Sequence, residues 1–178
     1  MKDRILTISR SIDWLNESIG KSISWLTLFM VLVMFSIVIL RYILNEGSIA
    51  LQESVSYMHA VVFMLGAAYT LKNDSHVRVD IFYSKMSDRT KAVVNFMGNL
   101  LLLLPVCIFI VWSSWDYVME SWRLKESSRE AGGLPWIYLL KTSILIMALL
   151  LILQAIADMI RNFFNIINPT ITTNSDIA

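Results

Sequence analysis

The stretch SISWLTLFMVLVMFSIVIL, from Ser22 to Leu40, decides the fold class because its nineteen residues include no charge. An α-helix rises about 1.5 Å per residue, so about 20 apolar residues are needed to cross about 30 Å of hydrocarbon. Arg41 and Tyr42 follow the stretch, and Trp25 lies near its beginning, as expected of residues that anchor a helix at the two membrane surfaces. The stretch therefore predicts a transmembrane helix over about residues 22–42.

Three further apolar stretches predict three further spans. The second covers about residues 53–71 and the third about residues 92–115. Pro105 in the third removes a backbone hydrogen bond, so a kink is expected there. The fourth covers about residues 136–158 and is long enough only if Lys141, one turn inside, extends its ammonium group to the headgroups. A re-entrant or half-buried segment is the alternative for this fourth stretch.

The composition also indicates an all-α membrane protein. Of the 178 residues, 56% are hydrophobic and only 16% are charged, whereas soluble domains carry about 25% charged residues. The net charge of +1 gives no reason to expect nucleic acid as a partner. Cys107 is the one cysteine, so no internal disulfide can form. We expect a domain of four transmembrane helices over residues 22–160.

Residues 1–21 predict an amphipathic helix ahead of the first span. Charged residues interrupt this segment, so it lacks the uncharged core of a signal peptide. Its apolar residues recur at spacings of three and four, which places them on one helical face; they are Ile5, Ile8, Ile12, Leu15 and Ile19. We expect this helix to lie in the plane of the lipid headgroups. A short helix that packs on a partner is the alternative.

The lysine and arginine residues predict the orientation. Ten of them belong to the N-terminal segment, the loop after the second span and the C-terminal tail, and five belong to the opposite side. Cytoplasmic segments are enriched in these residues, so we expect both termini in the cytoplasm. Residues 161–178 turn polar after Arg161 and are expected to form a disordered tail.

The sequence contains no recognisable catalytic motif. Phosphate-loop, dinucleotide-binding, zinc-protease and nucleophile-elbow patterns do not occur, so we expect no enzyme and no cofactor. A membrane anchor of a redox complex, holding haem or quinone, is the alternative function. Ligation of haem by two histidines would need both at a similar depth, but only His59 lies in a span, and His76 follows in the loop. A self-sufficient small exporter would need a carboxylate at mid-membrane, and none is found there.

Ionisable residues near the ends of the spans are candidates for anchoring or for pairing at an interface. Arg41, Glu53 and Lys141 lie near the expected headgroup levels rather than at mid-depth. Gly66, followed by two alanines, forms a small-residue patch where another helix could approach closely.

Two polar residues lie deeper in the third span. Asn95 and Asn99 are four residues apart, so they share one helical face and could hydrogen-bond to another helix.

Short motifs in a fixed order add to this interpretation. The first set is Arg41-Tyr42-Ile43-Leu44, Leu51-Gln52-Glu53-Ser54, Gly66-Ala67-Ala68-Tyr69 and His76-Val77-Arg78-Val79-Asp80-Ile81-Phe82. The second set is Glu126-Ser127-Ser128, Gly133-Leu134-Pro135-Trp136 and Lys141. Over roughly residues 23–158, the chain resembles the small membrane subunit, of the DctQ type, of tripartite ATP-independent periplasmic (TRAP) transporters. Many relatives carry a tryptophan and two adjacent acids before the second span, where this chain has Glu53 alone.

The resemblance implies a three-part uptake system in the inner membrane of a bacterium or archaeon. In such a system a periplasmic substrate-binding protein captures an organic acid, and a large membrane subunit carries it inward, driven by a sodium gradient. The small subunit packs along the large one and in the lipid as a fixed scaffold. The loop from Glu120 to Glu130 would face the periplasm and could contact the binding protein, a solvated mixed-charge loop being the alternative. The candidate residues for the partner interface or for anchoring are Arg41, Glu53, Gly66, His76, Asp80, Asn95, Asn99, Trp136 and Lys141.

Overall fold

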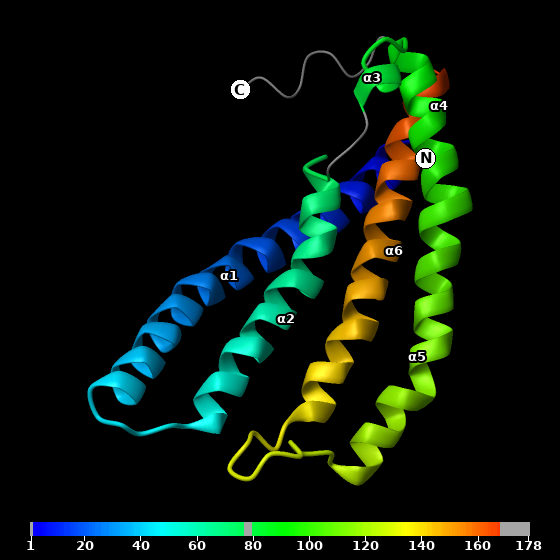
Figure 1. The fold of residues 1–178 in the computed structure, drawn as a ribbon. Helices are drawn as coiled ribbons and strands as arrows, with labels where there is room; N and C mark the ends of the chain where they lie inside the picture. Colours follow the sequence, from blue (N-terminus) through cyan, green and yellow to red (C-terminus); the bar gives the residue numbers. More distant parts are fainter. Residues whose placement is uncertain (1, 77–79, 168–178) are drawn as a thin grey trace.

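The computed structural model is a bundle of long α-helices (Figure 1). It describes residues 2–76 and 80–167. The helices are α1 (Lys2–Tyr42), α2 (Ile49–Lys72), α3 (Asp80–Tyr83), α4 (Asp88–Gly98), α5 (Leu104–Leu124) and α6 (Ile137–Ile167), with a π-helical turn η1 (Asn99–Leu103) between α4 and α5. Four stretches are long and apolar enough to cross a membrane: Ile5–Tyr42, Ile49–Lys72, Asp88–Leu124 and Ile137–Ile167. The predicted all-α fold with four such helices is confirmed.

The prediction of a separate N-terminal helix is wrong, because α1 runs without a break from Lys2 to Tyr42. Its first half lies along the bundle with its polar face turned inward: Ser9 is 2% exposed and Asn16 is 1% exposed. Ser9 Oγ donates to the carbonyl oxygen of Ala157 in α6. The amphipathic pattern is therefore real, but the polar face is the one that meets the neighbouring helix.

The crossing of α1 over α2 depends on Gly20. A Cβ atom at Gly20 would lie 2.4 Å from ring atoms of Tyr69 in α2, so no side chain fits there. A Cβ atom at Gly66 would meet only Ile23, at 3.8 Å, which is an ordinary contact. The two helices thus approach each other closely at Gly20, within the first half of α1.

The third apolar stretch is helical from α4 through α5, with Pro105 at the start of α5. Proline has no N–H to donate, so an α-helix cannot continue through it with every bond made. Just ahead of it, the N–H of Leu104 bonds to the carbonyl of Asn99, five residues back. The wider π-helical turn η1 thus changes the hydrogen-bond register beside the proline, at the place where the sequence predicts a kink.

Helix α6 is the centre of the bundle and contacts α1, α2, α4 and α5. Its buried positions include Ala148, Ala155 and Ala157, whose small side chains allow neighbouring helices to approach closely. By contrast, the most apolar part of α1 has no buried residue, and its C-terminal half diverges from the other helices (Figure 1). This half must be covered by lipid or by another chain in a membrane.

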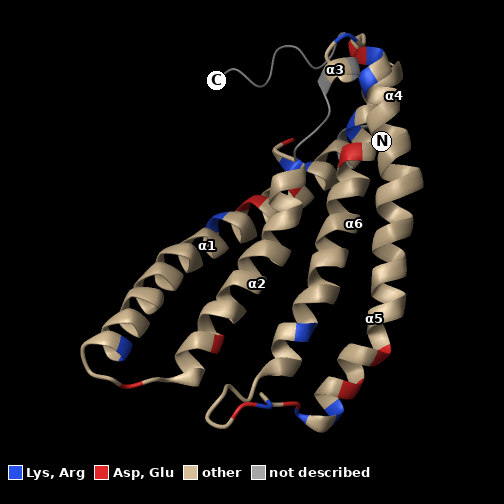
Figure 2. Cartoon of the chain, in the orientation of Figure 1, with Lys and Arg blue, Asp and Glu red and all other residues tan. Residues whose placement is uncertain are grey.

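Charged residues gather at the two ends of the bundle, and the middle is nearly free of them (Figure 2). We call the end with the N-terminus and Lys72 the N-terminal end, and the end with the 43–48 and 125–136 loops the hairpin end. Lys141 and Asp158 mark the two ends on α6 and are separated by about 26 Å at about 1.5 Å per residue. This separation is close to the thickness of the hydrocarbon core, about 30 Å. The charge pattern therefore agrees with a bundle that spans the bilayer.

Substitution of Gly20 by leucine is expected to lower the thermal unfolding midpoint of the detergent-solubilised protein, because the new side chain would overlap the Tyr69 ring. Overpacking of this kind costs about 1–3 kcal/mol. Gly66→Ala is the matched control, because its Cβ has room and alanine favours the helix by about 1 kcal/mol. Equal midpoints for Gly20→Leu and the unaltered chain would contradict the close crossing.

Candidate functional site

The hairpin end is held together by Glu53, near the start of α2. Its carboxylate accepts a hydrogen bond from the Ser128 hydroxyl and another, at 2.6 Å, from the backbone N–H of Leu134. Both donors belong to the loop between α5 and α6. Gly133 allows the approach, because a Cβ there would lie 2.4 Å from Ser128 Oγ and 2.8 Å from Glu53 Oε2. Glu53 thus ties α2 to a loop that lies 75 to 81 residues away in sequence.

Lys141 forms the second contact of the hairpin end. Its ammonium group donates to Glu126 and lies 3.9 Å from the centre of the Tyr117 ring. The Lys141 side chain is only 13% exposed, so a paired cation there is far less costly than an unpaired one. The structure therefore pairs Lys141 with Glu126 within the chain, a partner that the sequence did not identify.

Glu126 lies in the loop just beyond α5, and its pKa is lowered. The hydrogen bond from Lys141 is the largest cause, followed by the hydrogen bond from the Ser121 hydroxyl at 2.7 Å. Both donors stabilise the charged carboxylate. A carboxyl group whose pKa is lowered on folding stabilises the fold above its unfolded pKa, about 4.3, and this stabilisation is lost as the pH falls through the folded value.

The N-terminal end has a polar cluster centred on Gln154 of α6, which is fully buried. Its Nε2 donates to Asp13 Oδ1 at 2.9 Å and to Asp158 Oδ1 at 3.1 Å. Its Oε1 accepts from Asn16 Nδ2 at 2.7 Å. The two carboxylates accept from the amide N–H groups, so the orientation of the Gln154 amide is fixed by its partners.

Arg161 completes this cluster. Its guanidinium donates to Asp13 of α1 and to Asp158 of its own helix. About one helical turn after Asp13 on α1, Glu17 accepts a hydrogen bond from Lys72 of α2 at 2.6 Å. These contacts join α1, α2 and α6 at the N-terminal end, much as Glu53 and Lys141 join α2, α5 and α6 at the hairpin end.

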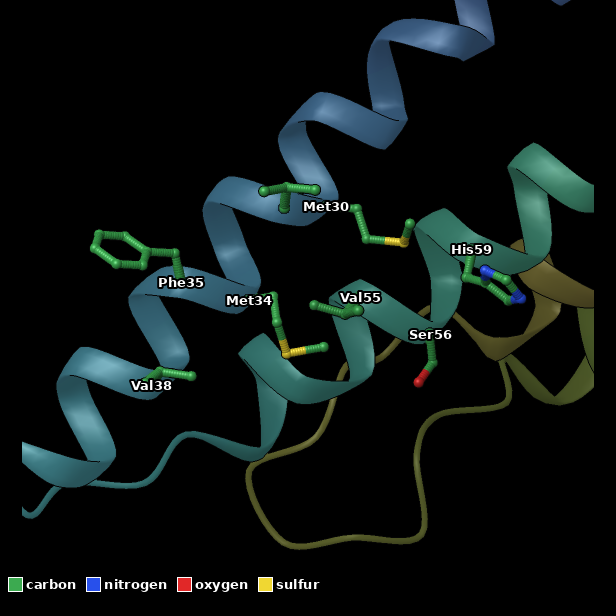
Figure 3. Close-up of a pocket in the computed structure, with 8 residues that line it drawn as sticks. Met30, Met34, Phe35, Val38, Val55, Ser56 and His59 are labelled. Carbon is green, nitrogen blue, oxygen red and sulfur yellow. The ribbon is translucent and has the colours of Figure 1, made fainter.

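An open groove of about 690 Å³ separates the second half of α1 from α2 (Figure 3). Met30 and Met34 reach from α1 toward α2, and Val55 reaches back from α2. His59 lies at one edge of the groove and stacks near Phe63 of its own helix, with ring centres 6.4 Å apart. The flexible methionine side chains allow this surface to adapt to an apolar neighbour.

The remaining candidate residues from the sequence lie apart from these clusters. Arg41 is exposed in the last turn of α1, and His76 is exposed beyond the end of α2. Asp80 begins α3, but its side chain and residues 77–79 lie outside the described part of the chain. Trp136 is 50% exposed, and its carbonyl accepts from the N–H groups that begin α6.

The two asparagines in the third apolar stretch contact groups that are close to them in the sequence. Asn95 Nδ2 donates to the Tyr83 hydroxyl at 2.9 Å, which ties α4 to the short α3 rather than to another long helix. Asn99 is half-buried at the start of η1, where its backbone carbonyl accepts from Leu104. A role for either residue toward a partner stays a prediction.

The sequence interpretation missed the cluster around Gln154. A signal was present, because Ser9, Asp13, Asn16 and Gly20 recur at spacings of four, three and four on α1. On α6, Gln154, Asp158 and Arg161 follow the same helical spacing. Two polar faces of this kind on apolar helices favour each other as partners, because each satisfies the other's hydrogen bonds.

The arrangement is that of a clamped bundle. Polar contacts fix the helices at both ends. The charged groups of the described residues also lie near those ends (Figure 2). Within residues 2–76 and 80–167 no group of three or more His, Cys, Asp or Glu side chains could hold a metal ion. Such a bundle can hold its shape and present an apolar lateral surface.

Comparison with known proteins agrees with this geometry. The family model of the DctQ component of tripartite ATP-independent periplasmic transporters matches residues 30–165. A protein of Haemophilus influenzae named "Putative TRAP transporter small permease protein" is 30% identical over 93 residues, which are 52% of this chain and 56% of that protein. The aligned part thus spans about half the length of the relative. No solved structure matches the chain.

The chain therefore belongs to the DctQ family and is a small permease subunit of a TRAP transporter, a multi-pass membrane component that is not an enzyme. The family predicted from the ordered motifs is confirmed. The matched residues run from the second half of α1 to the last turns of α6. They include both clamped ends, apart from the groups that the first half of α1 contributes to the N-terminal end.

Replacement of Gln154 by leucine is expected to lower the unfolding midpoint, because it leaves the buried Asn16 amide and the Asp13 carboxylate short of a partner. Each buried group left unsatisfied costs about 1–3 kcal/mol. Asn16→Leu should also destabilise the protein, and the double variant should cost less than the sum of the two single variants. Additive costs, measured by thermal unfolding in detergent, would show that the two amides are not coupled.

Replacement of Glu126 by glutamine is expected to lower the unfolding midpoint at neutral pH, because Lys141 loses its anionic partner. The difference from the unaltered chain should shrink as the pH falls below about 4.3, because the unfolded chain then takes up a proton at Glu126, and it should vanish once the pH falls through the lowered pKa of the folded carboxyl group. Glu120→Gln is the control: its pair with Arg123 is exposed, so only a small change is expected. A difference that stays constant down to pH 3 would contradict the assigned role of Glu126.

Proposed function

We propose that this small TRAP permease subunit is a fixed membrane scaffold for the large membrane subunit, and that the assembled transporter imports an organic acid with a sodium gradient. The family supports a large membrane subunit and a periplasmic binding protein as partners. In this proposal the large subunit carries the substrate, and the small subunit supplies a stationary surface. Both termini lie in the cytoplasm and the hairpin end faces the periplasm of a bacterial or archaeal inner membrane.

The observation that carries the proposal is the contrast between the two clamped ends and the bare half of α1. Lys72–Glu17 and Arg161–Asp13 fix one end, and Glu53 fixes the other. Between them, residues such as Phe29, Val31 and Phe35 of α1 are 55–62% exposed. An apolar helix that leaves most of its surface exposed supports a role in contact with lipid and with another membrane protein.

The 125–136 loop supports a second contact. It is held against α2 by Glu53, so its polar surface has a defined position at the hairpin end. With the hairpin end in the periplasm, this loop would help to receive the substrate-binding protein. Arg129 and Glu130 are exposed on it and offer both signs of charge.

The redox-anchor alternative gains no support from the placement of the histidines. His59 lies along α2 at the edge of the groove, whereas His76 lies past the end of the same helix. A pair of ligands at one depth would be needed for haem.

We expect the chain to co-purify with the large membrane subunit of its transporter, and we expect no sodium-driven uptake from the small subunit alone in proteoliposomes. Uptake of a radiolabelled organic acid should require the large subunit, the small subunit and the binding protein together. Sodium-driven uptake by the small subunit alone would contradict the proposal, as would full activity without it. A visible absorption spectrum of the same preparation is the check on the alternative, since a Soret band would favour a redox anchor.

A further inference from the structure

Asp116 is an exposed carboxylate within the third apolar stretch, and neither the clamped ends nor the motifs explain it. It lies on α5 beside Tyr117, whose ring faces the Lys141 ammonium group. Asp116 is thus at the level of the Lys141–Glu126 pair, about two turns inside the end of α5. Among the described residues, no hydrogen bond or ion pair is formed by its side chain.

The charged groups nearest to Asp116 on the same face of α5 leave it without a counter-ion. Glu120 follows one turn later and Arg123 almost two turns later. The Arg123 guanidinium donates to both oxygens of Glu120, at 2.7 and 2.5 Å. The cation of this face is therefore already paired, and the face keeps an excess of one negative charge.

A groove of about 460 Å³ begins at Asp116 and runs between α5 and α6. Trp112 and Trp115 line it on α5 and are 78% and 51% exposed. Leu149 and Ile152 line it on α6. On α5 the groove reaches Ile108, which is about 12 Å from Asp116 along the helix at about 1.5 Å per residue.

We propose that this groove binds a phospholipid with a primary ammonium headgroup, of the phosphatidylethanolamine type. The ammonium group pairs with the Asp116 carboxylate and lies beside the two indole rings, which attract cations. One of the two acyl chains follows the apolar part of the groove toward the middle of the membrane.

The shape and the charge both favour a lipid of this class. The carboxylate lies at the end of a mainly apolar groove, at the level where headgroups begin, which matches a polar headgroup followed by one of the two acyl chains of the lipid. The excess negative charge of this face repels phosphatidylglycerol, whose headgroup is anionic. Phosphatidylcholine carries a cation but has no N–H to donate to the carboxylate.

The purified full chain, exchanged into detergent with equal amounts of phosphatidylethanolamine and phosphatidylglycerol, provides the test by native mass spectrometry. We expect the chain to retain phosphatidylethanolamine about tenfold more than phosphatidylglycerol, as one charge-assisted hydrogen bond would produce. Asp116→Asn should abolish this preference. Glu120→Gln is the matched control and should leave it unchanged, since Glu120 is already bound to Arg123. Because Asp116 is exposed, both variants should fold, and their unfolding midpoints verify this.

Equal retention of the two lipids by the unaltered chain would overturn the proposal, and so would a preference that survives Asp116→Asn. Trp112→Leu keeps the groove apolar and should weaken the preference in part. A fourth result would assign the groove to a protein cation instead: loss of co-purification with the large subunit in Asp116→Asn, with the lipid preference unchanged. The test uses the isolated chain, so its failure would leave the scaffold function untouched.

Discussion

The structure depends most on the polar side chains that enter the apolar bundle and find hydrogen-bond partners inside the chain. Helix α6 carries such side chains near both ends, Lys141 at one and Gln154 at the other. Each forms hydrogen bonds with groups outside α6. Lys141 donates to Glu126, just beyond α5, and Gln154 bonds to Asp13 and Asn16 of α1. Because unsatisfied polar groups are costly in a membrane, these pairings specify which helices lie next to α6 and in which register.

These pairings also explain which parts of the fold followed from the sequence and which did not. Length and composition alone identify the four apolar stretches as membrane helices. A stretch such as Ser22–Leu40 is predicted to be helical whichever helices it packs against. The first half of α1 was ambiguous, because an amphipathic pattern gives a polar and an apolar face without saying which one meets protein. The answer depends on Gln154 and Asp158, which lie about 140 residues away in sequence.

For the candidate site, the sequence predicted the kind of contact but not the residues that form it. Glu53 and Lys141 were identified as groups that pair near the membrane surface, but their partners were not. Ser128 and Leu134 belong to a loop whose path depends on the close approach allowed by Gly133. Gly20 was missed as a packing position because a single glycine in a helical pattern has many uses, and only the ring of Tyr69 shows which one applies here.

The clamped ends give the function its physical meaning. Helices α2 and α6 take part in the contacts at both ends, whereas α1 joins them at one end and α5 at the other. Contacts of this kind resist relative movement, so in the proposed function the bundle serves as the fixed part against which a transport domain moves. The most direct test measures the distance between spin labels at the exposed Ser24 of α1 and Ser113 of α5, with Cys107 replaced by alanine, in the assembled transporter. A stationary scaffold gives one unchanged distance distribution with and without sodium, substrate and binding protein. A shift of several ångströms on adding any of them would contradict a stationary scaffold.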